Sequence, residues 1–147
     1  LHDALPISAS RGDLPLLRAD EKRMIQVLFN LLSNGIKFTK PGGSVTVEAA
    51  AAADGGLTIT VADTGIGMSA AELAIAMEPF RQADSRLSRR YGGTGLGLPL
   101  AKALVELQGG RLTLASMPGS GTLAHIVFPP DRLLTRRAVT RLDAAAS

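Results

Sequence analysis

Two asparagines and a lysine on one predicted helix are the first residues whose types and spacing suit a binding site. Gln26, Asn30, Asn34 and Lys37 follow at spacings of four, four and three residues, which places them along one helix face. A carboxamide oxygen is a hard ligand that suits Mg²⁺, an ion that shares its ligands with waters and substrate phosphates. Lys37 would face the same phosphates as a point charge. An ordinary solvated face is the alternative interpretation.

A second motif, Asp63-Thr64-Gly65-Ile66-Gly67, lies at the end of a predicted strand. An aspartate there can accept a hydrogen bond from an exocyclic amine such as that of adenine. The two glycines allow a sharp turn and a close approach of the backbone to a flat ring. A plain strand-to-helix turn is also consistent with this motif.

A third, glycine-dense segment at residues 92–98 lies directly before a predicted helix. Its glycines free backbone N–H groups to bind phosphate, and the helix N-terminus adds its dipole. The dinucleotide-binding and Walker patterns both fail, because no strand runs into the segment and no Gly-Lys-Ser/Thr follows. A hinge is the alternative, and we favour phosphate binding.

A fourth segment, residues 119–122, lies between the last two predicted strands. By itself it is typical of a hairpin turn. The hydroxyl of Thr122 becomes a candidate ligand only as a companion to the other three motifs.

The composition describes an ordinary globular chain. Its 147 residues suit one domain, and 46% of them are hydrophobic and 20% charged. The absence of cysteine excludes a disulfide scaffold and a thiolate metal site and fits a reducing compartment, so we expect a cytoplasmic domain. No apolar run approaches the ~20 residues of a membrane span, although the parent protein could be anchored through another segment. The basic residues behind the net charge of +3 are dispersed and few aromatics accompany them, which disfavours nucleic-acid binding.

The elements that must position these motifs follow from periodicity and turn residues. Asp20 is a predicted N-cap, and Ser69 with Glu72 forms a predicted capping box. Predicted helices cover residues 20–37, 69–77 and 96–107, and predicted strands cover residues 14–18, 44–48, 57–61, 111–115 and 122–128. This order lacks strict strand–helix alternation. It predicts an α/β (α+β) two-layer sandwich, with a mixed sheet of about five strands and three helices layered on one face.

The chain divides into three predicted regions. Residues 1–13 are interpreted as an N-terminal remnant or linker, because they resemble nothing that follows. Residues 14–130 form the predicted domain, which closes at Pro129-Pro130. Residues 131–147 are interpreted as a basic tail.

Taken together and in order, the motifs resemble the catalytic ATP-binding domain of bacterial sensor histidine kinases. This domain has the Bergerat fold of the superfamily of gyrase, chaperone, histidine kinase and MutL ATPases (GHKL). Residues 30–39 resemble the N box, residues 63–67 the G1 box, Phe80 the F box, residues 93–98 the G2 box and residues 119–122 a trailing Gly-Thr block. Residues 80–92 resemble the lid of kinases from hybrid or phosphorelay systems. The resemblance covers about residues 14–129.

The resemblance implies a role for each matching residue. Asn30, Asn34 and Lys37 would form the catalytic group, with Asn34 as the main Mg²⁺ ligand, Asn30 as its possible partner and Lys37 at the phosphates. Asp63 would bind the adenine amine, and Thr122 would join a water-bridged network around adenine. The other implied ATP-binding residues are Gly65, Gly67, Phe80, Arg89, Arg90, Gly93, Thr94, Gly95, Leu96 and Gly97. Which of Arg81, Arg89 and Arg90 would contact the γ-phosphate stays open.

Asn30 bears on the choice between phosphotransfer and hydrolysis. Hydrolysing branches of the superfamily typically have a glutamate there, and an asparagine cannot replace it as a general base. The resemblance therefore implies a protein-histidine kinase domain that binds Mg·ATP and presents the γ-phosphate to a histidine on a separate dimerisation domain. The chain's own histidines are His2 and His125, and His125 is expected to be a strand side chain. We therefore expect no autophosphorylation of this chain.

The expected partners are that dimerisation domain, normally in the same polypeptide, and a response regulator or receiver domain. We expect no contact with nucleic acid or with a membrane. One alternative is a serine kinase of the anti-sigma type, which usually keeps a glutamate where this chain has Asn30. Another is a non-catalytic interaction module.

Two residues depart from the family pattern. Gly35 stands where the family usually has alanine, and we expect it to cost the helix about 1 kcal/mol. Pro99 falls in the first turn of the last long predicted helix, where N–H groups lack helical partners anyway.

Overall fold

The computed structural model describes residues 7–11, 14–78 and 97–134. Within these ranges the α-helices are α1 (Glu21–Lys37), α2 (Ala70–Ala76) and α4 (Gly97–Leu107). The strands are β1 (Ile7–Arg11), β2 (Leu16–Leu17), β3 (Val45–Ala51), β4 (Leu57–Asp63), β5 (Arg111–Met117), β6 (Gly121–Phe128) and β7 (Leu133–Leu134). A single 3₁₀ turn, η1 (Pro130–Arg132), precedes β7.

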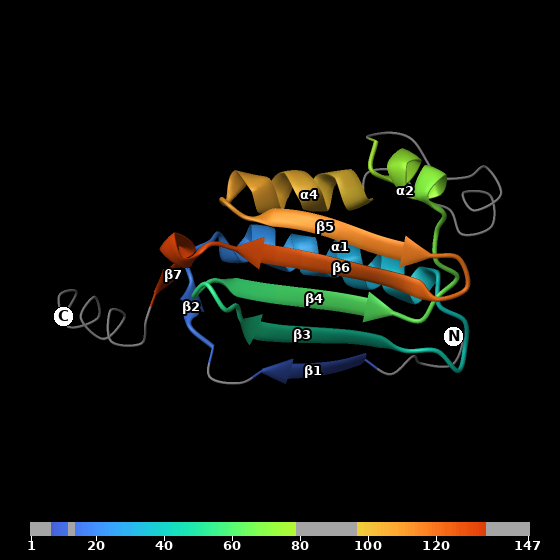
Figure 1. The fold of residues 1–147 in the computed structure, drawn as a ribbon, viewed down its shortest axis with the longest axis horizontal. Helices are drawn as coiled ribbons and strands as arrows, with labels where there is room; N and C mark the ends of the chain where they lie inside the picture. The colour runs from blue at the N-terminus through green and yellow to red at the C-terminus, as the bar shows by residue number, and fades with distance from the viewer. Residues whose placement is uncertain (1–6, 12–13, 79–96, 135–147) are drawn as a thin grey trace.

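The main sheet is mixed, with the strand order β1-β3-β4-β6-β5 (Figure 1). The edge strand β1 runs parallel to β3, and all the other pairs are antiparallel. Three helices and a mixed sheet of about five strands confirm the predicted fold class. Among the described residues, no helix has the length and apolar character that crossing a membrane requires.

Helix α1 begins and ends where its sequence predicts. The side chain of Asp20 accepts a hydrogen bond from the backbone N–H of Arg23 at 3.1 Å, which satisfies one free donor of the first turn. The buried residues of α1 recur on one face of the helix and are Met24, Val27, Leu31 and Gly35. This face packs on β3 and β4.

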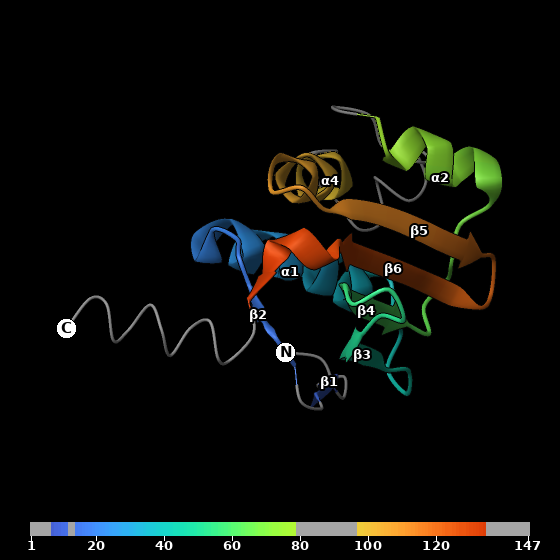
Figure 2. The ribbon, with the colours of Figure 1, turned by 60° about the vertical axis from the view of Figure 1, so that its left-hand side comes forward.

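Helices α1 and α4 lie side by side against the sheet (Figure 2). The core between these layers is almost wholly aliphatic, as the scarcity of aromatics requires. Its fully buried large side chains are Val27, Val45, Val105, Ile126 and Phe128. Because α1 and α4 are fixed on the same sheet, their ends are held in a defined relation to the strand ends.

The edge of the sheet differs from the prediction. The strand predicted at residues 14–18 is not part of the main sheet; the two-residue strand β2 instead pairs with β7 in a separate small sheet. A hydrogen bond of 2.6 Å from the Arg18 N–H to the Arg132 carbonyl continues this pair. The edge position belongs to Ile7–Arg11, whose alternation of Ile, Ser, Ala, Ser and Arg was missed as a strand. β1 pairs with β3 over five residues, whereas β2 consists of only two leucines, too few to pair along the same length of the sheet edge.

The short helix α2 confirms its predicted capping box. The Ser69 hydroxyl accepts from the Glu72 N–H at 3.2 Å, and the Glu72 carboxylate accepts from the Ser69 N–H at 3.0 Å. This reciprocal pair fixes where the chain turns into α2 after the glycine-containing segment that follows β4.

Candidate functional site

The predicted site residues that the structure describes gather at one end of the sheet. The C-terminal ends of α1 and β4, the N-terminal end of α4 and the turn between β5 and β6 meet there, at the right of Figure 1. Four of the sequence motifs therefore contribute residues to one region, although up to about 90 residues separate them in the chain.

The two asparagines of α1 face the first residue of α4. The Asn30 side-chain NH₂ donates to the Gly97 carbonyl at 3.5 Å, and its oxygen accepts from the Gln26 amide at 3.1 Å. A Cβ placed on Gly97 would lie 3.6 Å from Nδ2 and 3.7 Å from Oδ1 of Asn34. Glycine at position 97 thus leaves the Asn34 carboxamide uncovered by a side chain from α4.

The Asn34 carboxamide is available to bind a polar ligand. It is half-buried, and it has no hydrogen-bond partner among the residues that the structure describes. Its oxygen is a hard donor beside a helix N-terminus, a combination that fits Mg²⁺ carried on phosphates. Lys37 is exposed in the last turn of the same helix.

Asp63 is the last residue of β4 and lies beside the C-terminal end of α1. A Cβ added to Gly35 would lie 3.6 Å from the Asp63 Cβ, so the backbone next to Asn34 lies close to the aspartate. Asp63 Oδ1 accepts from the Gly65 N–H at 2.9 Å. Burial raises the pKa of the Asp63 carboxyl, and backbone hydrogen bonds from Gly65 and Thr122 partly offset that rise. The result is a desolvated acceptor that is well suited to recognising an N–H donor.

Both glycines of the Asp63–Gly67 motif sit where a side chain cannot fit. A Cβ on Gly65 would collide with the Phe38 carbonyl oxygen, and a Cβ on Gly67 would collide with that of Met117. Gly67 also has a φ of +68°, in the left-handed region that favours glycine. The N–H of Ile66 donates to the Phe38 carbonyl at 3.0 Å. The segment is therefore clamped between the end of α1 and the β5–β6 turn.

Thr122 lies directly opposite Asp63 in the pairing of β6 with β4, and opposite Ser116 in the pairing of β6 with β5. Ser116 is a residue that the sequence analysis missed. Its hydroxyl lies 2.8 Å from the Thr122 hydroxyl, accepts from the Met68 N–H at 2.8 Å and donates to the Gly121 carbonyl at 3.0 Å. The only signal in the sequence is its place six residues before Thr122 across a tight turn, which predicts a cross-strand neighbour.

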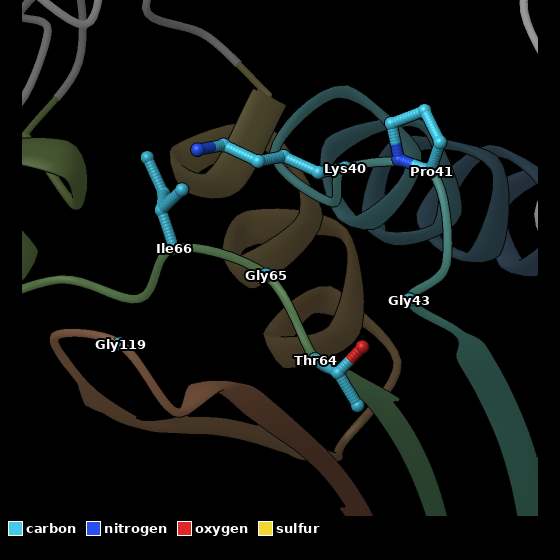
Figure 3. Close-up of a pocket in the computed structure, with 7 residues that line it drawn as sticks. All are labelled: Lys40, Pro41, Gly43, Thr64, Gly65, Ile66 and Gly119. Atoms are coloured by element: carbon cyan, nitrogen blue, oxygen red, sulfur yellow. The ribbon is translucent and has the colours of Figure 1, made fainter.

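A shallow pocket of about 250 Å³ borders this region (Figure 3). Its lining residues are Lys40, Pro41, Gly43, Thr64, Gly65, Ile66 and Gly119. Figure 3 shows Lys40, from the segment after α1, extending toward Ile66 of the segment after β4. Gly65 alone belongs both to this lining and to the predicted site, so the pocket adjoins the asparagine–aspartate region and does not coincide with it.

The described part of the chain thus joins Asn30, Asn34, Asp63, Gly65, Gly67, Gly97 and Thr122 in one region. Seven other predicted site residues lie outside the described residues: Phe80, Arg89, Arg90, Gly93, Thr94, Gly95 and Leu96. Arg81 lies outside them too. Their roles remain predictions from the sequence.

A family profile described as "Histidine kinase-, DNA gyrase B-, and HSP90-like ATPase" matches residues 19–132. Among curated proteins, the chain is similar to the cell-division control histidine kinase PdhS of Brucella abortus and of Brucella suis. Both are 45% identical over 135 residues, which cover 86% of this chain. The same alignments cover 13% of each relative, so the chain corresponds to a small part of their length.

Solved structures agree with this similarity. Full-length ShkA in complex with AMPPNP superposes with a TM-score of 0.73 at 32% identity, over 89% of this chain and 26% of ShkA. The mycobacterial sensor histidine kinase MprB gives a TM-score of 0.66 at 25% identity, over 85% of this chain and 80% of that chain. The catalytic domain of the histidine kinase ThkA gives the same TM-score and identity, over 86% of this chain and 79% of that chain.

Proposed function

Because the chain belongs to the family of histidine kinase-, DNA gyrase B- and HSP90-like ATPases, as the catalytic ATP-binding domain of a sensor histidine kinase, we propose that it holds Mg·ATP at the end of its sheet. The γ-phosphate would then be presented to a histidine on a separate dimerisation domain. The observation that carries this proposal is that the Asn30 and Asn34 amides both lie near Gly97, at the start of α4. Gly35, the residue after Asn34, lies close to Asp63.

The two poles of the site suit the two ends of a nucleotide. Asp63 offers a desolvated acceptor for the adenine amine. Gly65, where a Cβ would lie 2.8 Å from Asp63 Oδ1, keeps a side chain away from that carboxylate. Asn34 offers a carboxamide oxygen for Mg²⁺, with Gly97 receiving phosphate at the start of α4 and Lys37 adding positive charge. When bound, Mg²⁺ would supply neutralisation of the charge on the phosphates.

The environment of Asn30 favours transfer over hydrolysis. Its oxygen accepts a hydrogen bond from the Gln26 amide, and its NH₂ donates to the Gly97 carbonyl. These two hydrogen bonds fix the orientation of the side chain between α1 and α4. Neither group of an amide can take a proton from water. A site that positions the phosphates without activating water suits a protein nucleophile, because phosphoryl transfer depends mainly on positioning and charge neutralisation.

The acceptor and the later partner are also part of the proposal, because the chain spans 13% of the length of the PdhS relatives. We place the acceptor histidine on a dimerisation domain, and the next phosphate acceptor on a response regulator or receiver domain. This is the arrangement of a two-component system or phosphorelay. Its setting would be the cytoplasm, where Mg·ATP is abundant.

Calorimetric titration with ATP, with Mg²⁺ or with EDTA, tests the metal end of the site. The parent chain should bind ATP more tightly with Mg²⁺. Asn34→Ala should lose this Mg²⁺-dependent gain in ATP affinity. The affinity measured with Mg²⁺ should fall at least about tenfold, because even the loss of a residue that only supports a metal ligand costs that much.

Ser33→Ala, at the neighbouring position of α1, is the matched control and should bind like the parent. Binding of the parent that is insensitive to EDTA would contradict the Mg²⁺ assignment. Absence of ATP binding by a folded parent chain would contradict the proposed function itself.

A further inference from the structure

Ser116 has a hydroxyl whose hydrogen-bonding capacity is completely used. A serine hydroxyl carries one proton and two acceptor lone pairs. The Gly121 carbonyl oxygen, 3.0 Å away, can only accept, so the Ser116 proton points to it. The Met68 N–H, 2.8 Å away, can only donate and takes one lone pair. One lone pair is left, and it faces the Thr122 hydroxyl at 2.8 Å.

This arrangement determines which way the Thr122 proton points. Two hydroxyl oxygens at 2.8 Å need a proton between them, and the proton of Ser116 is already committed to Gly121. Thr122 must therefore donate to Ser116. Its own two lone pairs are left for a ligand or a water, and it has no proton to offer them.

The row of three strands brings this oriented hydroxyl to Asp63. Asp63, Thr122 and Ser116 are direct partners across β4, β6 and β5, so their side chains share one face of the sheet. Gly121 makes the close approach possible, because a Cβ there would collide with the Asp63 carbonyl. The Asp63 carboxylate and the oriented Thr122 hydroxyl, which both act only as acceptors, thus lie on neighbouring strands where the adenine base is proposed to bind.

We propose that Ser116 is a positioning residue that holds the Thr122 hydroxyl as an acceptor and so makes the site select a purine with an exocyclic amine at C6. The proposal rests on the function proposed above. A 6-amino purine has two N–H donors for two acceptors. A 6-keto purine instead presents at C6 an oxygen, which meets two acceptors and no donor. Its neighbouring N1–H leaves it one N–H donor where the 6-amino purine has two.

The ratio of the affinities for ATP and inosine triphosphate measures this selection, because inosine carries a keto oxygen where adenosine carries the amine. Ser116→Ala frees the Thr122 proton to turn toward a keto oxygen. The ratio should fall by about two- to tenfold, the range expected of one neutral hydrogen bond. A purely structural role would weaken both nucleotides equally and leave the ratio unchanged.

A double-mutant cycle shows whether Ser116 acts through Thr122. Thr122→Val removes the hydroxyl with little change of shape, and Ser116→Ala should then reduce the ratio no further. Ser116→Thr keeps a hydroxyl and should retain most of the parent ratio. Ser116→Cys, similar in size with a weak donor, replaces Ser116→Ala if that variant does not fold.

Amide hydrogen exchange in the nucleotide-free chain gives an independent readout. The Met68 amide should exchange faster in Ser116→Ala, because it loses its acceptor, and at the parent rate in Thr122→Val. An unchanged ATP-to-inosine-triphosphate ratio in Ser116→Ala, or an equal fall in the Thr122→Val background, overturns the proposal. A folded parent chain that binds neither nucleotide overturns the proposed function, and this inference with it.

Discussion

Asp63 combines a stability cost with a binding function in one side chain. Its carboxyl is desolvated by burial, which raises its pKa, and the hydrogen bonds from the Gly65 and Thr122 N–H groups offset only part of that effect. In the nucleotide-free chain the charged carboxylate therefore destabilises the fold. A bound amine would supply the hydrogen bond that burial takes away.

We predict that Asp63→Asn weakens ATP binding and removes a pH-dependent destabilisation. A carboxyl whose pKa is raised in the folded state contributes stability below its unfolded pKa and loses it as the pH rises through its folded pKa. The parent should lose stability relative to Asp63→Asn across that window, above the ordinary value of 3.8. Urea denaturation at a series of pH values, with calorimetry at neutral pH, measures both effects.

Asp54→Asn is a matched control for this variant. Asp54 makes the same local hydrogen bond, from the Gly56 N–H at 2.9 Å, but lies exposed in the turn between β3 and β4. It should not show the loss of ATP affinity. If Asp63→Asn bound ATP as tightly as the parent, Asp63 would not be the adenine ligand.

Residue type and spacing single out Asp63, Asn34, Gly65 and Gly67 as candidates, because few residue types supply an acidic acceptor, a hard amide oxygen or a left-handed turn. The structure brings these candidates to one end of the sheet, and their roles stay predictions. Ser116 could not be found in this way. Serine is common in strands and turns, and its importance comes from two strand pairings and a contact with the Met68 N–H. Such a role depends on three-dimensional register, which residue type does not specify.

At the scale of elements, α1 is the part that links the two poles of the site. Its buried face packs on the sheet, its amide face meets α4 at Gly97, and its C-terminal carbonyl at Phe38 anchors the segment after β4. A change in the packing of α1 would therefore move the two asparagines relative to Asp63, which is held on β4.

Gly35 is a weak point of this helix. A glycine inside a helix is less stable than alanine by roughly 0.5–1 kcal/mol. An added Cβ would meet the two Val45 methyl groups at 3.4 Å and the Asp63 Cβ at 3.6 Å, which are ordinary contacts. We predict that Gly35→Ala stabilises the chain by about 0.5–1 kcal/mol, measured by urea denaturation.

Gly67→Ala provides the opposite case in the same measurement. Its φ of +68° and the collision with the Met117 carbonyl should make an alanine clearly destabilising. A loss of stability in Gly35→Ala would mean that the space at Val45 cannot accept a methyl group.

The capped helices were predictable because their signals are local. The Asp20 cap and the Ser69–Glu72 capping box are read within four residues of the chain, and both are present. The edge strand was not predictable from the same rules. Ile7–Arg11 becomes a strand by pairing with Val45–Ala49, some 38 residues away, and Leu16 and Leu17 pair with β7 instead. Short strands are decided by the partner that is available.

At the scale of the whole molecule, the sheet itself separates His125 from the proposed site. Residues alternate between the two faces along a strand, so His125, three residues after Thr122 in β6, lies on the opposite face. Its Nδ1 is 3.1 Å from the Thr60 hydroxyl, as expected of a structural strand side chain. His2 lies outside the described residues.

We therefore predict that the isolated chain binds Mg·ATP without phosphorylating itself. Incubation with ATP labelled at the γ-phosphate should leave this chain unlabelled, because a nucleotide on the helix-covered side cannot reach a histidine on the other face. Adding a histidine-bearing dimerisation domain of a sensor histidine kinase should place acid-labile phosphate on that domain. The same domain with its acceptor histidine changed to alanine is the control and should stay unlabelled. Label on this chain alone that His125→Ala abolishes would place the acceptor within it and overturn the division of labour proposed here.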